Sequence, residues 1–187
     1  MVQSLVLASQ SPRRKELLEI LGIPFSILSP QTDETPLRGE SADRYVVRVA
    51  RDKAKDVASR LENSVILSAD TVVTIDGEIL GKPVHRDDAI RMLGRLAGRE
   101  HRVYTAVCVV DQPRGRTRQG LEETAVWFKA LTEADIAMYV DRENVMDKAG
   151  AYGIQGFASV FIPRIEGSYS NVMGLPMALV YELLVKT

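Results

Sequence analysis

Hydrophobic positions along the chain follow two different spacings, and these predict where strands and helices lie. Short apolar runs are typical of strands, whereas apolar residues three or four positions apart are typical of helices. We expect strands over residues 4–8, 25–28, 64–75, 101–111, 121–131 and 159–167. We expect helices over 11–21, from Ser41 to about Leu61, over 86–96 and 133–141, and from Pro176 to about Val185. The elements are interleaved and some strands can form hairpins, so the pattern predicts a mixed α/β sheet flanked by helices.

Two other segments read as loops. Residues 29–41 are polar and rich in turn formers, and residues 147–158 are punctuated by glycine. Pro163 lacks a backbone N–H group and therefore indicates an edge strand. The histidines at 85 and 101 stand among charged neighbours, without metal-ligand spacing, and we expect both at the surface.

Length and composition favour one globular domain, spanning residues 1–187, or two lobes that share a sheet. Hydrophobic residues make up 45% of the chain and charged residues 26%, which is enough for a sizeable core and argues against disorder. The formal net charge is -1, whereas proteins that coat nucleic acid are usually more basic. Any polyanionic partner must therefore be met by a local cluster of cations.

The chain holds one cysteine, Cys108, which excludes a disulfide framework within one chain and a zinc site made of cysteines. We expect Cys108 to be a small core residue and the protein to occupy a reducing compartment, the cytoplasm. No apolar run approaches the roughly 20 residues that a membrane span requires.

The start of the first helix breaks a local rule. Ser11 is a suitable N-cap and Pro12 a suitable first residue, so Arg13, Arg14 and Lys15 fall in the first turn. Each cation there is unfavourable by roughly 0.3–1 kcal/mol because the helix dipole is positive at that end. One interpretation is a solvated basic turn. The other is a docking site for a polyphosphate, to which Ser9 and Ser11 would add hydroxyl groups.

Lys53 and Asp70 are charged residues at positions that the pattern assigns to the interior. Lys53 lies near the centre of the apolar stripe of the second long helix, where it must either reach solvent or meet an anion. Asp70 lies within the strand "VILSADTVV", where a carboxylate can hold a metal, activate a water molecule or pair with an arginine. Glu34, in the polar loop, is a second candidate carboxylate or a solvated loop acid.

Two loop residues complete the candidates. Lys82 stands between Gly81 and Pro83, where it is either a surface turn lysine or a cation presented toward a ligand. Gln155 lies in "GAYGIQG", a segment that can fold over a flat ligand or remain a plain surface loop. Its amide offers both a donor and an acceptor.

Taken together, these side chains fit a nucleoside triphosphate and a divalent metal. Arg13, Arg14, Lys53 and Lys82 can neutralise the phosphates. Glu34 and Asp70 can hold Mg²⁺ or Mn²⁺ with the help of substrate phosphates and water. A carboxylate near the metal can also take a proton from water.

The sequence closely resembles the Maf family of nucleoside triphosphate pyrophosphatases over essentially its whole length. The stretches that carry the resemblance are "LASQSPRRKELL", "DET", "RVARDKA", "SADTVV", "GEILGKP", "LAGREHRVYTAV", "DKAGAYGIQG" and "GSYSNVMGLP". The resemblance implies a mixed α/β fold similar to that of inosine triphosphate pyrophosphatases, with a cleft between two lobes. It also implies hydrolysis between the α and β phosphates with a divalent metal, and it makes a homodimer plausible.

By the same resemblance, Asp70 matches the proton acceptor of the family. Arg13, Thr71 and Gln155 match positions associated with substrate choice, and a further set matches other residues of the site. That set is Ser9, Arg14, Glu34, Lys53 and Lys82. "SPRR", "ADT" and "IQG" follow the pattern of the subfamily that acts on dTTP and UTP, rather than of the one that acts on 7-methyl-GTP.

The family is also associated with septum formation, which leaves a nucleotide-binding regulator of cell division as the alternative to an enzyme. Only the enzyme requires Asp70. A nucleic-acid binder is disfavoured by the near-neutral charge and by the lack of a platform of stacking aromatic residues.

Overall fold

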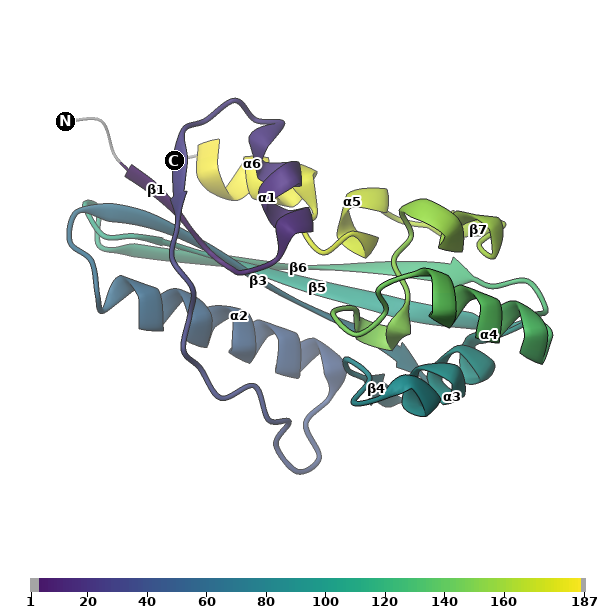
Figure 1. The fold of residues 1–187 in the computed structure, drawn as a ribbon. Helices are drawn as coiled ribbons and strands as arrows, with labels where there is room; N and C mark the ends of the chain where they lie inside the picture. The colour runs from purple at the N-terminus through teal and green to yellow at the C-terminus, as the bar shows by residue number, and fades with distance from the viewer. Residues whose placement is uncertain (1–3, 186–187) are drawn as a thin grey trace.

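A computed structural model describes residues 4–185, which form a seven-stranded mixed sheet with helices on both faces (Figure 1). The strand order is β2-β1-β3-β5-β6-β7, and β4 pairs with β3. The strands are β1 (Ser4–Ala8), β2 (Phe25–Ile27), β3 (Ser64–Ile75), β4 (Glu78–Leu80), β5 (Glu100–Asp111), β6 (Arg116–Trp127) and β7 (Arg164–Glu166). Neighbours are parallel from β2 to β3 and antiparallel from β3 to β7. This mixed sheet confirms the expected fold class.

The helices connect these strands and cover the two faces of the sheet. They are α1 (Pro12–Glu19), α2 (Ala42–Ala58), α3 (Arg86–Leu96), α4 (Glu133–Arg142), α5 (Tyr169–Val172) and α6 (Met177–Val185). Two short 3₁₀ helices, Ala149–Ala151 and Gly156–Val160, lie between α4 and β7. No helix within residues 4–185 has the length and apolar character needed to cross a membrane.

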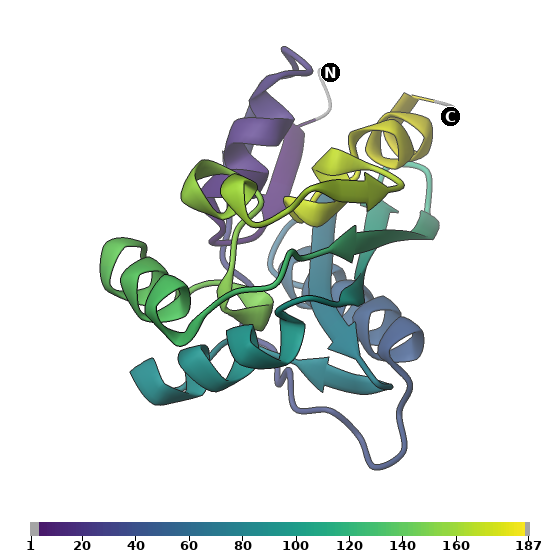
Figure 2. The same ribbon diagram turned by 90° about the vertical axis from the view of Figure 1, so that its right-hand side faces the viewer.

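The core consists of three hydrophobic clusters, one on the α2 face of the sheet and two on the opposite face. The α2 cluster packs Val46, Val49 and Val57 against Val6 and Ile66. On the other face, the α1–α6 cluster is centred on Leu7, Leu18, Leu67 and Leu175. The α3–α4 cluster is centred on Leu93, Leu96, Val126 and Tyr139. Figure 2 shows α1 and α6 at one end of the molecule and α3 and α4 at the other, which are the two expected lobes.

Local sequence signals explain several helix ends. The Ser11 hydroxyl accepts a hydrogen bond from the Arg14 amide, as an N-cap does. Gly22 follows α1 with a φ of 64°, a left-handed conformation that glycine adopts without strain. Thr132 forms a reciprocal capping box with Asp135 at the start of α4. Ser41 precedes α2 without a capping hydrogen bond from its side chain, and α2 ends at Ala58, earlier than expected.

Three expectations about elements were wrong in part. The strand expected over 121–131 is shifted: β6 begins at Arg116 and ends at Trp127. The chain then leaves the sheet, since the Lys129 amide donates to the Phe161 carbonyl. Only Arg164–Glu166 of the expected edge strand 159–167 is extended in the sheet, and the loop 147–158 contains 3₁₀ turns.

His101, expected at the surface, is only 2% exposed, because on β5 it shares a face with the buried residues Val103 and Thr105. Cys108 is buried as expected. His85 is exposed, and its Nδ1 atom accepts a hydrogen bond from the Asp88 amide at the start of α3.

Candidate active site

A cavity of about 670 Å³ lies where β3 lacks a neighbouring strand on one side. The pairing with β1 ends at Ser68, and β4 joins only from Val73, so residues 69–72 have no strand partner on that side within the described part of the chain. The cavity is lined by residues of both lobes, among them Ile154 and Met173 on one side and Val73 and Tyr152 on the other. Every candidate site residue of the sequence lines this one cavity.

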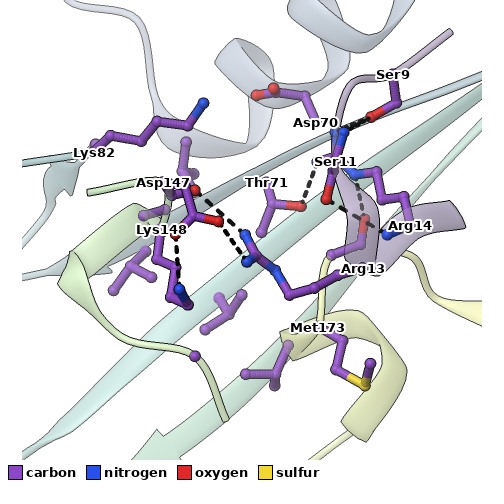
Figure 3. A pocket seen from close by; sticks show the side chains of 18 of the residues that line it. Ser9, Ser11, Arg13, Arg14, Asp70, Thr71, Lys82, Asp147, Lys148 and Met173 are labelled. Atoms are coloured by element: carbon purple, nitrogen blue, oxygen red, sulfur yellow. Dashed lines mark hydrogen bonds and ion pairs between the residues drawn. The ribbon is translucent and has the colours of Figure 1, made fainter. Parts of the chain in front are cut away.

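Asp70 and Thr71 lie side by side on β3, but their side chains leave opposite faces of the strand because side chains alternate along it. Asp70 points to the α2 face, whereas Thr71 points to the face that carries α1. The cavity reaches both because it surrounds the open strand edge between them (Figure 3).

On the α2 face, Lys53 binds two carboxylates. Its Nζ atom lies 2.8 Å from Oδ1 of Asp70 and 2.9 Å from Oε2 of Glu34. The side chains of Lys53 and Asp70 are each only 8% exposed. Lys53 was expected either to reach solvent or to meet an anion, and the structure shows that it meets an anion. The buried carboxylate of Asp70 is in turn neutralised by the Lys53 ammonium group at hydrogen-bond distance.

The loop that carries Glu34 is fastened along α2. The Tyr45 hydroxyl donates to the Glu34 carbonyl at 2.8 Å, and Nη2 of Arg48 donates to the Thr35 carbonyl at 3.1 Å. Nearer the start of the loop, the Gln31 amide donates to a carboxylate oxygen of Asp56 at 2.9 Å. These contacts hold the loop against α2, where Glu34 lines the cavity.

On the opposite face, Arg14 is held by several acceptors. Its Nε atom donates to the Gly174 carbonyl at 2.8 Å, and Nη2 donates to Oγ1 of Thr71 at 3.0 Å. Nη1 donates to the Ser9 hydroxyl at 3.4 Å. Oγ1 of Thr71 also lies 2.9 Å from Oγ1 of Thr105. The guanidinium group is thus fixed at the base of the cavity.

Arg13 extends across the cavity to a residue that sequence reasoning missed, Asp147 (Figure 3). Its Nη1 atom lies 2.8 Å from Oδ2 of Asp147, and Lys148 binds the other carboxylate oxygen at 2.7 Å. In the sequence these two residues are the "DK" that opens the glycine-punctuated loop 147–158.

The remaining candidates differ in their engagement. Ser9 and Ser11 support the turn before α1, since the Ser9 hydroxyl accepts from the Ser11 amide at 3.1 Å. Lys82 and Gln155 are exposed, line the cavity and have no side-chain partner among residues 4–185. Lys15 points away from the cavity and forms an exposed ion pair with Glu19. Two of the three cations at the start of α1 therefore face the cavity.

Burial and charge act in opposite directions on Asp70. Burial raises the pKa of the carboxyl group above its ordinary value, and the Glu34 carboxylate adds to the rise. Lys53 and Arg14 oppose it but do not cancel it. Burial, with a smaller contribution from the Asp70 and Glu34 carboxylates, raises the pKa of Tyr45 to about 12. A carboxylate with a raised pKa is a better proton acceptor than an exposed aspartate.

The charge of the cavity wall suits an anion, because the cations outnumber the carboxylates. The cations are Arg13, Arg14, Lys53, Lys82 and Lys148, and the carboxylates are Glu34, Asp70 and Asp147.

A divalent cation fits the Asp70–Glu34 pair only with help from a ligand. The two carboxylates converge on one cationic atom, Nζ of Lys53, which shows that their oxygens can share a cation. No group of three or more His, Cys, Asp or Glu side chains suitable for a metal occurs within the described residues. Mg²⁺ commonly takes one or two carboxylates and completes its shell with waters and substrate phosphates, so the pair matches that type of site.

Comparison with known proteins gives a consistent result. The profile of a family described as Maf-like protein matches residues 4–187. The dTTP/UTP pyrophosphatase of Syntrophomonas wolfei subsp. wolfei is 46% identical over 180 residues, which cover 96% of this chain and 95% of that protein. The dTTP/UTP pyrophosphatase of an Anaeromyxobacter species is 49% identical over 183 residues, covering 96% and 87%.

Among solved structures, the Staphylococcus aureus Ham1 protein matches with a TM-score of 0.48. It is 14% identical and covers 67% of this chain and 72% of its own. A similarity this distant carries no argument about activity.

Proposed function

The chain belongs to the Maf family, and from this premise we propose that it is a dTTP/UTP pyrophosphatase. It hydrolyses the bond between the α and β phosphates and releases the nucleoside monophosphate and pyrophosphate. The observation that carries the proposal is the Lys53–Asp70 pair, buried at the open edge of β3 and facing a cavity rich in cations.

The phosphate tail binds to cations that reach the cavity from different elements. Arg14 at its base and Lys82 at its rim supply positive charge from the two sides, and both have N–H donors for phosphate oxygens. Arg13 adds a third cation at the start of α1. Gln155, whose amide has no partner within the described residues, offers a donor and an acceptor to the edge of a pyrimidine base.

Asp70 accepts the proton of the attacking water molecule. Its raised pKa makes it a stronger base than an exposed carboxylate, and the adjacent Lys53 stabilises its ionised form before the reaction. Positioned proton acceptors of this kind contribute about 10²–10⁴-fold to rate.

Asp70 and Glu34 would hold a divalent metal together with the substrate phosphates. When bound, such a metal neutralises phosphate charge and so makes the phosphorus more open to attack. We also place the protein in the cytoplasm, a reducing compartment that suits a chain with one buried, unpaired cysteine.

The test uses the purified protein with dTTP or UTP and Mn²⁺, with pyrophosphate release as the measurement. We expect turnover by the wild type and a loss of about 10²–10⁴-fold in kcat for Asp70→Asn, with nucleotide still bound because the cations remain. Asp111→Asn is a matched control. Asp111 is also buried and ion-paired, with Arg114 in place of a lysine, but it lies outside the cavity.

Two results would contradict the proposal in different ways. Nucleotide binding without any pyrophosphate from the wild type would favour the regulator of cell division over the enzyme. Full turnover by Asp70→Asn would leave the activity in place but remove Asp70 from the proton transfer.

A further inference from the structure

The geometry points to Asp147 as a positioning residue that holds Arg13 across the cavity, so that the remaining N–H donors of its guanidinium group meet the nucleotide. The inference rests on the proposed function for the identity of the nucleotide. It assigns a role to a residue outside the set expected from the sequence.

The Arg13–Asp147 contact joins the two lobes. Arg13 lies in the first turn of α1, whose Leu17 and Leu18 belong to the α1–α6 cluster. Asp147 follows Val145, a member of the α3–α4 cluster. The ion pair therefore connects two separately packed parts of the molecule at the cavity between them.

Arg13 uses only part of its donor capacity on this contact. Nη1 donates to Oδ2 of Asp147 at 2.8 Å, and Nη2 donates to the Asp147 backbone carbonyl at 3.3 Å. A guanidinium group has five N–H donors in a rigid plane. The remaining N–H donors of Arg13 have no partner within residues 4–185, and its side chain is 22% exposed beside the cavity. Fixing one edge of the plane therefore directs the remaining donors.

Asp147 is itself held in place, which a positioning role requires. Lys148 binds its second carboxylate oxygen at 2.7 Å and also donates to the Asn144 carbonyl. The stem of Lys148 passes over Gly153, where an added Cβ atom would lie 3.0 Å from Cε of the lysine. Gly153 thus leaves the space that lets Lys148 reach Asp147.

Asp147 remains ionised over any ordinary assay range. Burial raises the pKa of its carboxyl group, but hydrogen bonds from Lys148 and Arg13 outweigh burial and leave the pKa below its usual value. The contact is therefore present at every working pH and does not act as a pH switch.

A competing role for Asp147, as a group that blocks Arg13, predicts the opposite change in nucleotide affinity. If the Asp147 carboxylate occupied the donors that the triphosphate needs, removing it would strengthen nucleotide binding. We favour positioning, because the carboxylate and the carbonyl of Asp147 each accept from a different terminal nitrogen and leave other donors available.

The experiment compares Asp147→Ala, Arg13→Ala and the double variant, with Asp141→Ala as control. Asp141 forms a similar ion pair with Arg86, at 2.7 Å, but on the surface and away from the cavity. We measure kcat and KM for UTP, and Kd for a UTP analogue with a non-hydrolysable α,β linkage by calorimetry.

We expect Asp147→Ala to raise KM and Kd about tenfold while kcat changes less than twofold. This result indicates the loss of an interaction that binds the substrate and the transition state equally. In the Arg13→Ala background, the same change should have no further effect, because Asp147 acts through Arg13. Asp147→Asn, which keeps an acceptor oxygen, should recover part of the affinity. Asp141→Ala should leave KM and Kd unchanged.

An unchanged or lowered Kd for Asp147→Ala would overturn the inference, as would an equal loss in the Arg13→Ala background. If Asp147→Ala does not fold, Asp147→Asn answers the same question, with thermal unfolding to confirm that the variant is native. The calorimetry needs no turnover, so a wild type that binds the analogue but releases no pyrophosphate would refute the proposed function, while the Kd of Asp147→Ala would still support or overturn this inference.

Discussion

Two buried pairs of titratable side chains lie on neighbouring strands of the sheet, and they differ in charge and in access to the cavity. On β3, Asp70 is paired with Lys53 and opens onto the cavity. On β5, His101 shares a hydrogen bond of 2.7 Å with the hydroxyl of Tyr152. The rings of Tyr152 and Phe128 pack edge-on against the imidazole. The first pair joins opposite charges, whereas the second is neutral.

The comparison shows that burial of a titratable group does not by itself mark an active site. Burial lowers the pKa of His101 to about 4, so the ring remains neutral at physiological pH and packs like an aromatic residue. Burial raises the pKa of Asp70, but two cations and an open cavity surround it. A buried group becomes a candidate for catalysis where a countercharge accompanies it and a ligand can reach it.

The largest expected effect comes from breaking the charged pair. Lys53→Met should lower the free energy of unfolding by about 3–5 kcal/mol at neutral pH, because it leaves Asp70 buried without its main partner. It should also raise the pKa of Asp70 further. Because the pKa of Asp70 is higher in the folded than in the unfolded protein, its contribution to stability is present at low pH and is lost as the pH rises through the folded pKa. Urea unfolding should therefore show a greater deficit at pH 8 than at pH 5.

The control for that prediction is the double variant Lys53→Met with Asp70→Asn, which removes both charges. It should recover most of the lost stability at pH 8 while remaining inactive. A double variant as unstable as Lys53→Met alone would show that packing of the lysine stem, rather than an unpaired charge, causes the loss.

A smaller effect, with the opposite pH dependence, is expected at His101. A histidine whose folded pKa of about 4 lies below its ordinary value of 6.5 stabilises the fold at high pH and loses that contribution as pH falls between these values. From pH 7.5 to pH 5 the loss is about 2 kcal/mol. His101→Gln should lack this part of the pH dependence in urea unfolding, whereas His85→Gln, at an exposed position, should retain it.

The smallest effect concerns Tyr152, which belongs to both regions because its side chain lines the cavity and its hydroxyl binds His101. Tyr152→Phe removes that partner and should lower the free energy of unfolding by about 1 kcal/mol. Its kcat for UTP should stay within about twofold, because the hydroxyl is engaged in the core. A large fall in kcat with unchanged stability would assign the hydroxyl to the site instead.

The contrast between these regions also explains which parts of the site the sequence could predict. Lys53 and Asp70 were recognisable because each breaks the apolar pattern of a clearly periodic element, and the structure gives each a countercharge. His101 was misread because Glu100 and Arg102 flank it. The alternation of a strand, which places His101 on the face of Val103, was the signal that should have prevailed.

Two other features could not be predicted from the local sequence. Asp147 meets Arg13 across 134 positions of the chain, so only the tertiary fold reveals the contact. The first five residues of β6, Arg116–Gly120, are exposed or half-buried and lie on the part of the strand that does not pair with β7. They therefore lack the apolar run that marks a strand. The starts of the helices were predicted more closely, since caps such as Ser11 and Thr132 act locally.

The unequal lengths of the strands decide whether a ligand can reach β3. The reactive opening exists because β1 stops at Ala8 while β3 continues, and β4 rejoins only at Val73. Extending β1 past Ala8 would pair residues 69–72 with ordinary ladder hydrogen bonds and close this window. It would also draw Ser9 and Ser11 into the sheet, so the residue at which β1 stops sets both the opening and the start of the cationic turn.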